Sequence, residues 1–279
     1  MKKAYIQFKL PLKKDIKERL DVMMELGEIP SLEERADGLY ILDAWRHRHR
    51  LRSCLETAFP DEVLTELGLE EKDWNREWIE GFQPLPITEN VWITPPWHVD
   101  RVPDGKITII INPGNAFGTG THESTRLALE CMTRLVRNGD IVWDLGCGSG
   151  ILSIAAMKLG ALRVCAMDND PEIHTNMSEN IELNKVNGIN MEIGDVLLMN
   201  DFNCDLAVIN IQKHIILPLL ERFNIAKVTP KHVILAGLLN EHRQEIESAL
   251  KKQAYDVIEV RQLNNWIAVA AVKRSSNEK

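Results

Sequence analysis

The sequence predicts an α/β protein in which a small α+β domain precedes a larger domain built on a mainly parallel sheet. From about residue 93 onward, short apolar strands alternate with stretches of helical periodicity, and one strand runs directly into a glycine-rich turn and a helix. The first 62 residues combine the two-residue alternation of a strand with the spacing of amphipathic helices. We therefore expect domains over 1–62 and 93–275, joined by a linker with a helix over 63–92.

Composition limits the class of protein. The chain has 279 residues, of which 44% are apolar, enough for a sizeable core. No apolar run of about 18 residues occurs, and the alternating N-terminal stretch lacks an apolar block, so we expect neither a membrane span nor a signal peptide. Five cysteines without C-x-x-C spacing favour reduced thiols, no metal site and a cytoplasmic location. The formal charge of −8 disfavours a general nucleic-acid binder.

In the small domain, apolar Ile6, Phe8 and Leu10 alternate with polar residues, which is typical of a half-buried strand. The periodicity then predicts a helix over 16–24, a strand over 38–45 and a helix over 48–59 that Pro60 ends. These elements favour a small α+β domain of the ferredoxin-like kind.

The linker contains two tryptophans at helical spacing. Trp74 and Trp78 are four residues apart in "KDWNREWIEGF", so they would share one face of a helix. We interpret them as an apolar contact between the two domains rather than as ligand contacts.

The most informative stretch is "IVWDLGCGSGILSIAAMKLGA". A strand over 141–145 continues into Gly146, Gly148 and Gly150 and then into a helix. Glycines in such a turn permit positive φ angles and let a ligand approach the backbone closely. Asp168 ends the next strand, where an acidic side chain can hold two ribose hydroxyls.

Dinucleotide-dependent dehydrogenases use the same layout, so the two kinds of cofactor have to be separated. Their G-x-G-x-x-G fingerprint needs a very small residue at position 151, where this chain has Ile151. Asp144, at the end of the strand, would repel a pyrophosphate but attract an ammonium and a sulfonium. S-adenosylmethionine carries both cations, a ribose and no phosphate, so we predict this methyl donor. The alternative is that the glycines serve only a tight turn.

Two more polar residues follow strands. Asp195 comes after the strand ending in "EIG" and could meet the adenine amino group, or it is an ordinary turn aspartate. Asn210 ends the strand "VIN" at the carboxyl edge of the sheet, where ligands of such folds bind. Its oxygen can accept N–H bonds from an amine and orient the lone pair, or it is an asparagine of a strand-end turn.

These motifs together resemble the bacterial ribosomal-protein methyltransferases of the PrmA type, which modify protein eleven of the large ribosomal subunit. The resemblance spans about residues 72–270 and rests on "DWNREWIEGFQPL", "VWITPPW", "NPGNAFGTGTHEST", "DLGCGSGILSIAAMKLGA", "MDNDP", "VINI" and "LAGLL". It implies a class I (Rossmann-like) S-adenosylmethionine methyltransferase domain behind a substrate-recognition domain, with amino groups of a basic ribosomal protein as acceptors. The chain departs from the family pattern at Asn112, Asn115 and Gln212.

The loop "NAFGTGTHEST" (115–125) can be interpreted in two ways. Thr121 or His122 can cap the helix that follows. The resemblance implies in addition that the loop covers the methionine end of the cofactor, with a hydroxyl from Thr125 and closure to water by Phe117. His122 is then either a base or a capping residue, and we favour the cap.

The expected site follows from these motifs and from the resemblance. We expect Asn210 to be the catalytic residue. The cofactor-binding residues are expected to be Phe117, Thr121, Thr125, Asp144, Gly146, Gly148, Asp168, Asp195 and Asn210. No metal is expected.

Three functions stay open. The first is a protein N-methyltransferase acting on lysine or other amino groups of the ribosomal protein. The second is a lysine methyltransferase for another protein, such as the beta subunit of electron-transfer flavoprotein, and the third is a non-catalytic cofactor-binding module. The basic run "RHRHRLR" (46–52) is either a solvated helix face or a contact for ribosomal RNA or an acidic protein surface.

Overall fold

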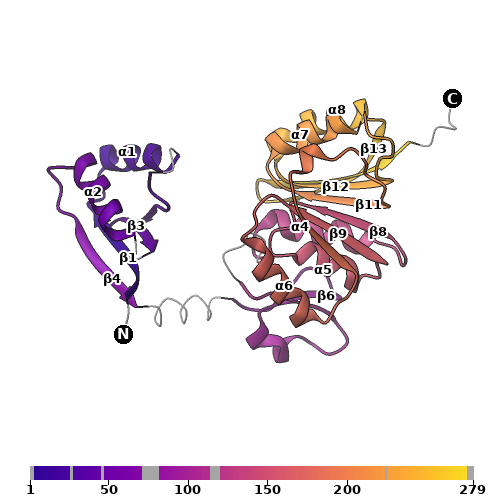
Figure 1. Cartoon of the computed structure of the whole chain (residues 1–279), viewed down its shortest axis with the longest axis horizontal. Helices are drawn as coiled ribbons and strands as arrows, with labels where there is room; N and C mark the ends of the chain where they lie inside the picture. Colours follow the sequence, from indigo (N-terminus) through magenta and orange to yellow (C-terminus); the bar gives the residue numbers. More distant parts are fainter. Residues whose placement is uncertain are drawn as a thin grey trace. The chain divides into compact units, whose positions relative to one another are not determined.

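The computed structural model describes residues 3–25, 28–44, 47–70, 82–113, 120–223 and 225–274. The chain divides into two compact units, residues 1–82 and 83–279, and each is described by itself (Figure 1). The predicted helix around Trp74 and Trp78 lies outside the described residues. A membrane-spanning helix is absent from the described part of the chain.

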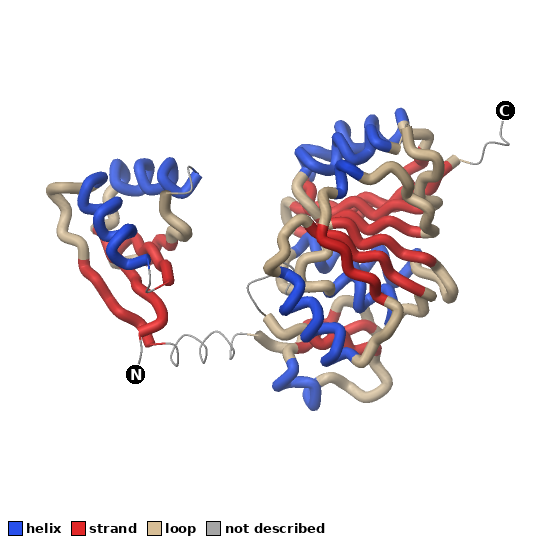
Figure 2. Tube along the Cα trace, viewed as in Figure 1, coloured by secondary structure: helices blue, strands red, loops and turns tan. Residues whose placement is uncertain are grey.

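The first unit has the element order β-α-β-β-α-β of ferredoxin-like folds. Its elements are β1 (Lys3–Leu10), α1 (Lys14–Glu25), β2 (Glu33–Arg35), β3 (Gly38–Ala44), α2 (Arg48–Ala58) and β4 (Thr65–Glu70). The four strands form an antiparallel sheet in the order β2-β3-β1-β4. Both helices lie on one face of this sheet (Figure 2), because the alternating side chains of β1 and β3 are buried against them.

Two strands of this unit differ from the sequence-based expectation. The short strand β2 was not predicted, because its three residues are all exposed and polar and show no apolar alternation. Strand β4 pairs with β1, so residues 65–70 belong to the sheet of the first unit rather than to the linker expected from residue 63. Its sequence, "TELGLE", has no β-branched residue apart from an exposed threonine, and only pairing with β1 makes it a strand.

The second unit contains a seven-stranded sheet in the order β10-β9-β8-β11-β12-β14-β13. Strands β8 to β12 run parallel to one another, and β14 runs antiparallel to its neighbours β12 and β13. The strands are β8 (Ile141–Leu145), β9 (Arg163–Asp168), β10 (Ile189–Ile193), β11 (Leu206–Asn210), β12 (His232–Leu239), β13 (Tyr255–Leu263) and β14 (Trp266–Lys273). This arrangement confirms the α/β class with a mainly parallel sheet.

Helices cover both faces of this sheet. On one face lie α4 (Glu123–Leu135), α5 (Ile151–Lys158) and α6 (Ile173–Asn184), and on the other lie α7 (Lys213–Arg222) and α8 (Arg243–Lys252) (Figure 1). Short 3₁₀ helices span Pro96–Arg101, Val196–Leu198 and Asn240–His242. A small three-stranded sheet of β5 (Leu85–Pro86), β6 (Val91–Thr94) and β7 (Ile107–Ile110) packs against the α4–α5 side.

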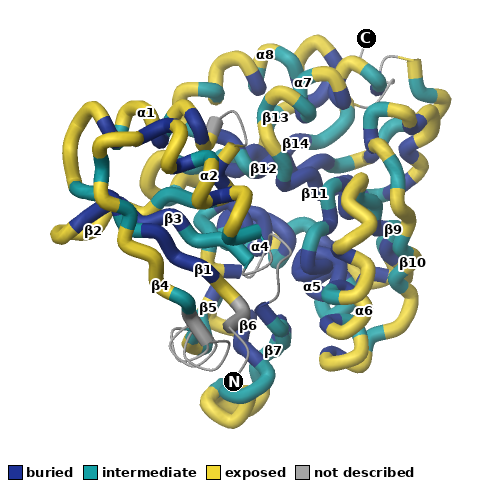
Figure 3. The backbone as a smooth tube through the Cα atoms, turned by 60° about the vertical axis from the view of Figure 1, so that its left-hand side comes forward, coloured by how far each residue is buried: buried dark blue, intermediate teal, exposed yellow. Residues whose placement is uncertain are grey.

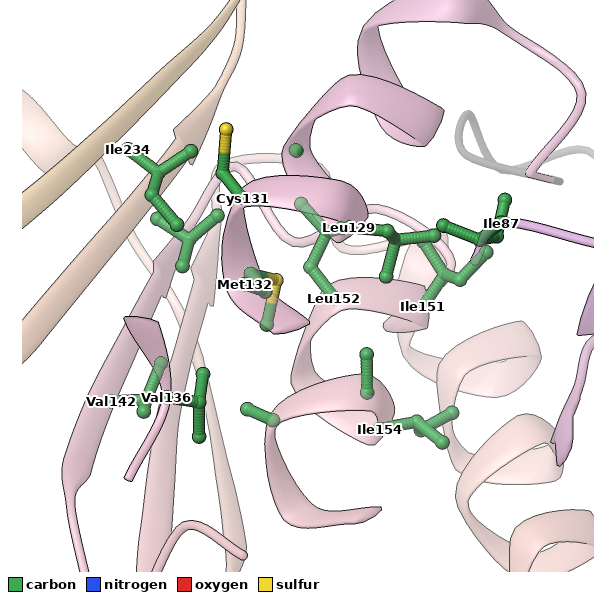
Figure 4. Packing of buried hydrophobic residues seen from close by; sticks show 14 of the residues in the cluster. Ile87, Leu129, Cys131, Met132, Val136, Val142, Ile151, Leu152, Ile154 and Ile234 are labelled. Atoms are coloured by element: carbon green, nitrogen blue, oxygen red, sulfur yellow. The ribbon is translucent and has the colours of Figure 1, made fainter. Parts of the chain in front are cut away.

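The core follows from strands that are apolar on both faces. Along β12, Ile234 and Ala236 face the cluster of α4 and α5, whereas Val233 and Leu235 face the cluster of α7 and α8. Strands buried in this way read as continuous apolar runs, as parallel sheets require. Figure 3 shows β11, β12 and β14 as buried, and Figure 4 shows the first cluster, in which side chains of α4 and α5 meet Ile234.

Strand β12 is interrupted near its carboxyl end. Its register with β14 shifts between Leu235 and Leu238, and Gly237 there has φ +77°. A Cβ atom at Gly237 would lie 2.4 Å from the backbone oxygen of Ile211, the residue after β11. The absence of a side chain therefore lets the ends of β11 and β12 approach each other closely.

Because the two strand ends approach so closely, adding one methyl group at Gly237 should destabilise the folded protein strongly. Gly237→Ala should lower the free energy of unfolding by about 2–4 kcal/mol, because strain at positive φ adds to a backbone collision. Gly105→Ala is the matched control, since Gly105 has φ +75° with no atom within 4 Å of an added Cβ. Urea unfolding measures both, and equal losses for the two variants would contradict the collision.

Candidate active site

The glycine turn after β8 has the backbone that the sequence predicts. Gly146, Gly148 and Gly150 have φ angles of +83°, +49° and +79°. A Cβ atom at Gly146 would lie 2.1 Å from Cγ2 of Ile211. The amide of Gly146 donates to the carbonyl of Met167 at the end of β9 (2.8 Å). Side chains are thus excluded where the turn passes between β9 and β11, and its backbone is open to a ligand.

A cavity of about 540 Å³ lies at the carboxyl ends of the parallel strands. Ligands of open α/β sheets bind at this edge, and the volume suits a small cofactor. The cavity is lined by His122, Ser124, Gly146, Gly148, Asp168, Asn169, Gly194, Asp195, Val196, Asn210, Ile211, Gln212, Ile215, Gly237 and Trp266. Five of the residues expected from the sequence are therefore brought together here: Gly146, Gly148, Asp168, Asp195 and Asn210.

Asp168 at the end of β9 is held by backbone amides. Oδ2 accepts from the amide of Gly148 (2.9 Å), and Oδ1 accepts from the amide of Asp170 (3.1 Å). Each carboxylate oxygen has a second acceptor site, so two hydroxyl groups of a ligand can still be bound. The bond to Gly148 also links the end of β9 to the glycine turn.

Asp195 caps a short helix and also lies at the cavity. Its Oδ1 accepts from the amide of Leu197 (2.8 Å), so it caps the 3₁₀ helix Val196–Leu198 as a turn aspartate does. The same residue lines the cavity next to Gly194 and Val196.

Asp144 lies in β8 and is not among the lining residues. It is 1% exposed, and Oδ2 accepts from the hydroxyl of Ser153 on α5 (2.6 Å). Oδ1 has no hydrogen-bond partner among the residues that the structure describes. Burial raises the pKa of this carboxyl to about 7, with a smaller upward contribution from the charge of Asp168 and an opposing one from the hydrogen bonds of Ser153. The sequence predicts a direct cofactor contact by Asp144, whereas the structure has it as a buried carboxyl outside the lining of the cavity.

Asn210 lies where β11 meets the cavity. Leu206 and Val208 point to the α4 face of the sheet, and by alternation Asn210 points there too. Its Nδ2 donates to Oγ1 of Thr125 on α4 (3.3 Å). Thr125 is fully buried and is not a lining residue, so its hydroxyl acts on Asn210 instead of lining the cavity.

The other amide atom of Asn210 is an unused acceptor. The residue is 9% exposed, and Oδ1 is buried without a partner in the described ranges. A buried acceptor of this kind costs free energy unless a ligand or water satisfies it. Because Nδ2 is held by Thr125, Oδ1 is the atom that can receive an N–H from a bound amine.

The loop ahead of α4 contributes a cap. His122 is the N-cap of α4, and its Nδ1 accepts from the amide of Ser124 (3.2 Å) and lies 2.8 Å from the Ser124 hydroxyl. This bond places the proton of the neutral ring on Nε2. The ring also makes an edge contact with Trp266, with 4.5 Å between centroids. The predicted capping role is therefore assumed by His122, whereas Thr121 is exposed and does not line the cavity.

Phe117 lies in residues 114–119, outside the described residues. Sequence reasoning also missed several lining residues. Trp266 and Ile215 belong to none of the motifs identified in the sequence. Gly194 and Asn169 follow strands directly, so their place at the strand ends was a usable signal.

The residues present fit S-adenosylmethionine better than a phosphate-bearing cofactor. Gly146 and Gly148 line the cavity without side chains, and the buried Oδ1 of Asn210 lacks a partner among the residues that the structure describes. Two carboxylates, Asp168 and Asp195, line the cavity, and among its described lining residues there is neither lysine nor arginine. Such a lining attracts cations and repels a pyrophosphate. The residues that the structure describes also contain no cluster suited to a metal ion.

Known proteins resemble this chain over most of its length. The family model "Ribosomal protein L11 methyltransferase (PrmA)" matches residues 46–274. The ribosomal protein L11 methyltransferase of Exiguobacterium sp. is 34% identical over 225 residues, which are 80% of this chain and 72% of that protein. The one from Acetivibrio thermocellus is 34% identical over 201 residues, 72% of this chain and 64% of the relative, so the match spans just under two thirds of its length.

A solved structure agrees with the sequence relatives. The ribosomal protein L11 methylase of Lactobacillus delbrueckii subsp. bulgaricus is 30% identical, with a TM-score of 0.63, and the match covers 70% of this chain and 100% of that chain. The family model, the relatives and the solved structure all indicate a methyltransferase, which agrees with a cavity that suits S-adenosylmethionine. The chain therefore belongs to the ribosomal protein L11 methyltransferase (PrmA) family of S-adenosylmethionine-dependent methyltransferases.

Proposed function

We propose that this protein methylates ribosomal protein L11, the substrate in the names of its relatives, and that the acceptors are amino groups. The observation that carries the proposal is the buried, unpartnered Oδ1 of Asn210 at the end of a cavity that suits a cationic donor. An amine that receives the methyl group carries an N–H, which needs an oxygen at this place to accept its hydrogen bond. A substrate that receives a hydride or a phosphoryl group has no such need.

The donor would be held along the strand ends. When bound, S-adenosylmethionine supplies an electrophilic methyl group on a sulfonium. Asp168 binds the ribose hydroxyls, and Asp195 receives the adenine amino group, since both line the cavity beside Gly194 and Val196. Gly146 and Gly148 let the backbone of the turn lie against the ligand. Thr121 and Phe117 are proposed contacts only from the family resemblance.

The acceptor has to lose a proton before it reacts. A free lysine has a pKa of about 10.4, so its deprotonation at pH 7 costs about 4.6 kcal/mol. The apolar side chains of Ile211, Ile215 and Trp266 line the cavity and disfavour the ammonium form. Asn210 Oδ1 then accepts an N–H and directs the lone pair, while alignment supplies much of the rate. The capping bond at Nδ1 keeps His122 from acting as the base in its neutral form.

A second target is favoured by one observation. Gln212 lines the cavity two residues after Asn210, at a place where the family commonly has an apolar residue. An amide there offers a donor and an acceptor to the acceptor chain and fits a different protein, such as the beta subunit of electron-transfer flavoprotein. With either target, we propose a cytoplasmic location for this protein.

Contact with ribosomal RNA is a weaker proposal. In the basic run, Arg52 is paired with Glu56 (2.8 Å) and Glu66 (2.9 Å). These carboxylates offset its charge, which supports the solvated helix face more than a nucleic-acid contact.

The target can be tested with purified proteins. Incubation with labelled S-adenosylmethionine and unmodified L11 should raise the mass of L11 in steps of one methyl group. The same donor in a cell extract lacking this enzyme should label L11 above other proteins. Label on another protein supports the second target, and donor binding without label anywhere supports a non-catalytic module.

Asn210 provides the sharpest test of the chemistry. Asn210→Ala should lower kcat about 100-fold, because the amine loses its alignment, while the Kd for the donor changes much less. Thr125→Val, which removes only the hydroxyl that holds Nδ2, should lower kcat about tenfold. Steady-state kinetics and calorimetry measure both quantities. Unchanged kcat in Asn210→Ala would refute the role.

Asp144 makes stability depend on pH. In the folded protein its pKa is raised to about 7 from 3.8, so the folded state keeps a proton that the unfolded chain has released. The contribution is fully present below about pH 4 and is lost as pH rises through about 7, at no more than about 1.4 kcal/mol per pH unit. Asp144→Asn should therefore flatten the fall in unfolding free energy between pH 5 and 7. Chemical denaturation at several pH values measures this, with exposed Asp201→Asn as the control that should leave the slope unchanged.

A further inference from the structure

Three asparagines of α6 form a row along one side of the helix. Asn176, Asn180 and Asn184 are four residues apart, which places them on one face. They meet the backbone at the end of β7 rather than other side chains. Asn184 accepts from the amide of Ile110 (2.8 Å) and donates to its carbonyl (2.5 Å).

The next two asparagines continue this pattern beyond β7. Asn180 Oδ1 accepts from the amide of Asn112 (2.8 Å), and Asn176 Nδ2 donates to the carbonyl of Asn112 (3.1 Å). The spacings match, because four helix residues rise about 6.0 Å and two strand residues about 6.6 Å. The asparagines thus satisfy the free edge of β7, which is the outer strand of its three-stranded sheet.

Asn180 differs from Asn176 and Asn184 by a hydrogen bond to the glycine turn. Its Nδ2 donates to the carbonyl of Ser149 in the glycine turn (2.9 Å), and the residue is fully buried. Ser149 lies between Gly148, which lines the cavity, and Gly150, which begins α5. One amide group therefore binds both the glycine turn and the chain that leads from β7 into residues 114–125.

A neighbouring side chain of α6 restrains the same turn by packing. A Cβ atom at Gly150 would lie 2.7 Å from Cγ of Met177, and Sγ of Cys147 lies 3.6 Å from its sulfur. Met177 is fully buried in this contact. The glycine turn is thus held on its α6 side by one hydrogen bond and one packed side chain.

We infer that Asn180 is a positioning residue for the methyl donor, acting through Ser149 and Asn112 without touching the ligand. It fixes the glycine turn relative to the segment that leads from β7 towards α4. Gly148 precedes Ser149 in the turn, and its amide donates to Asp168. A fixed turn therefore also fixes the carboxylate of Asp168 that is proposed to bind the ribose. The inference rests on the donor cavity of the proposed function and is independent of the protein target.

The test compares two variants of the same row. Asn180→Leu removes the bonds to Ser149 and Asn112. Asn184→Leu removes the bonds to Ile110 and to the carbonyl of Asn180, and leaves the side-chain bond from Asn180 to the glycine turn in place. Both should lower the Tm, because each leaves backbone groups of the edge unpaired. Only Asn180→Leu should raise the Kd for S-adenosylmethionine, by at least tenfold, whereas Asn184→Leu should stay within twofold of wild type.

Hydrogen exchange gives a second measurement on the same proteins. Amides of residues 146–150 should exchange faster in Asn180→Leu than in wild type, and at the wild-type rate in Asn184→Leu. If Asn180→Leu does not fold, Asn180→Asp replaces it, since it keeps the acceptor for Asn112 and loses the donor to Ser149. Its Kd should also rise at least tenfold.

The outcomes separate this inference from the proposed function. Wild-type affinity in the Asn180 variants, or equal losses of affinity in the Asn180 and Asn184 variants, would refute positioning and leave a purely structural role. A wild-type protein that bound no S-adenosylmethionine would overturn the proposed function together with this inference. Tight donor binding without methylation of L11 would overturn the target alone.

Discussion

The site depends on the packing of one isoleucine between two glycines. Ile211 follows β11, and an added Cβ atom would collide with it at Gly146 after β8 and at Gly237 in β12. Both glycines adopt positive φ angles, so the backbone of three adjacent strand ends converges on this residue. This convergence forms the inner wall of the cavity, and it places Asn210, the preceding residue, at its edge.

The position of Ile211 determines where the polar groups of the site lie. Residues alternate along β11, so Asn210 points to α4 and meets Thr125. Thr125 accepts a hydrogen bond from Nδ2 and leaves Oδ1 without a partner among the described residues. A site that is completed only by an incoming N–H discriminates strongly against ligands without one, because the buried acceptor would then stay unpaired.

The electrostatics of the cavity come from the same strand ends. Asp168 and Asp195 line it, and Asp144 is buried behind them in β8 with a raised pKa. Charges of one sign in a partly enclosed cavity attract a cationic ligand and raise its association rate. A bound cation would in turn favour the charged form of Asp144, so donor binding and the protonation of this carboxyl are coupled.

Local sequence determined the parts of the protein that neighbouring residues specify. The alternation of apolar strands and helices, the glycine turn after β8, Asp168 at the end of β9 and the cap ahead of α4 all depend on residues close together in the chain, and the structure has each of them. Tertiary structure decided the rest. The pairing of β4, the hydrogen bond between Asn210 and Thr125, the place of Trp266 in the cavity and the row of asparagines along β7 each depend on segments far apart in sequence. Periodicity cannot report such contacts, because it shows which face of an element is apolar but not which distant element that face will meet.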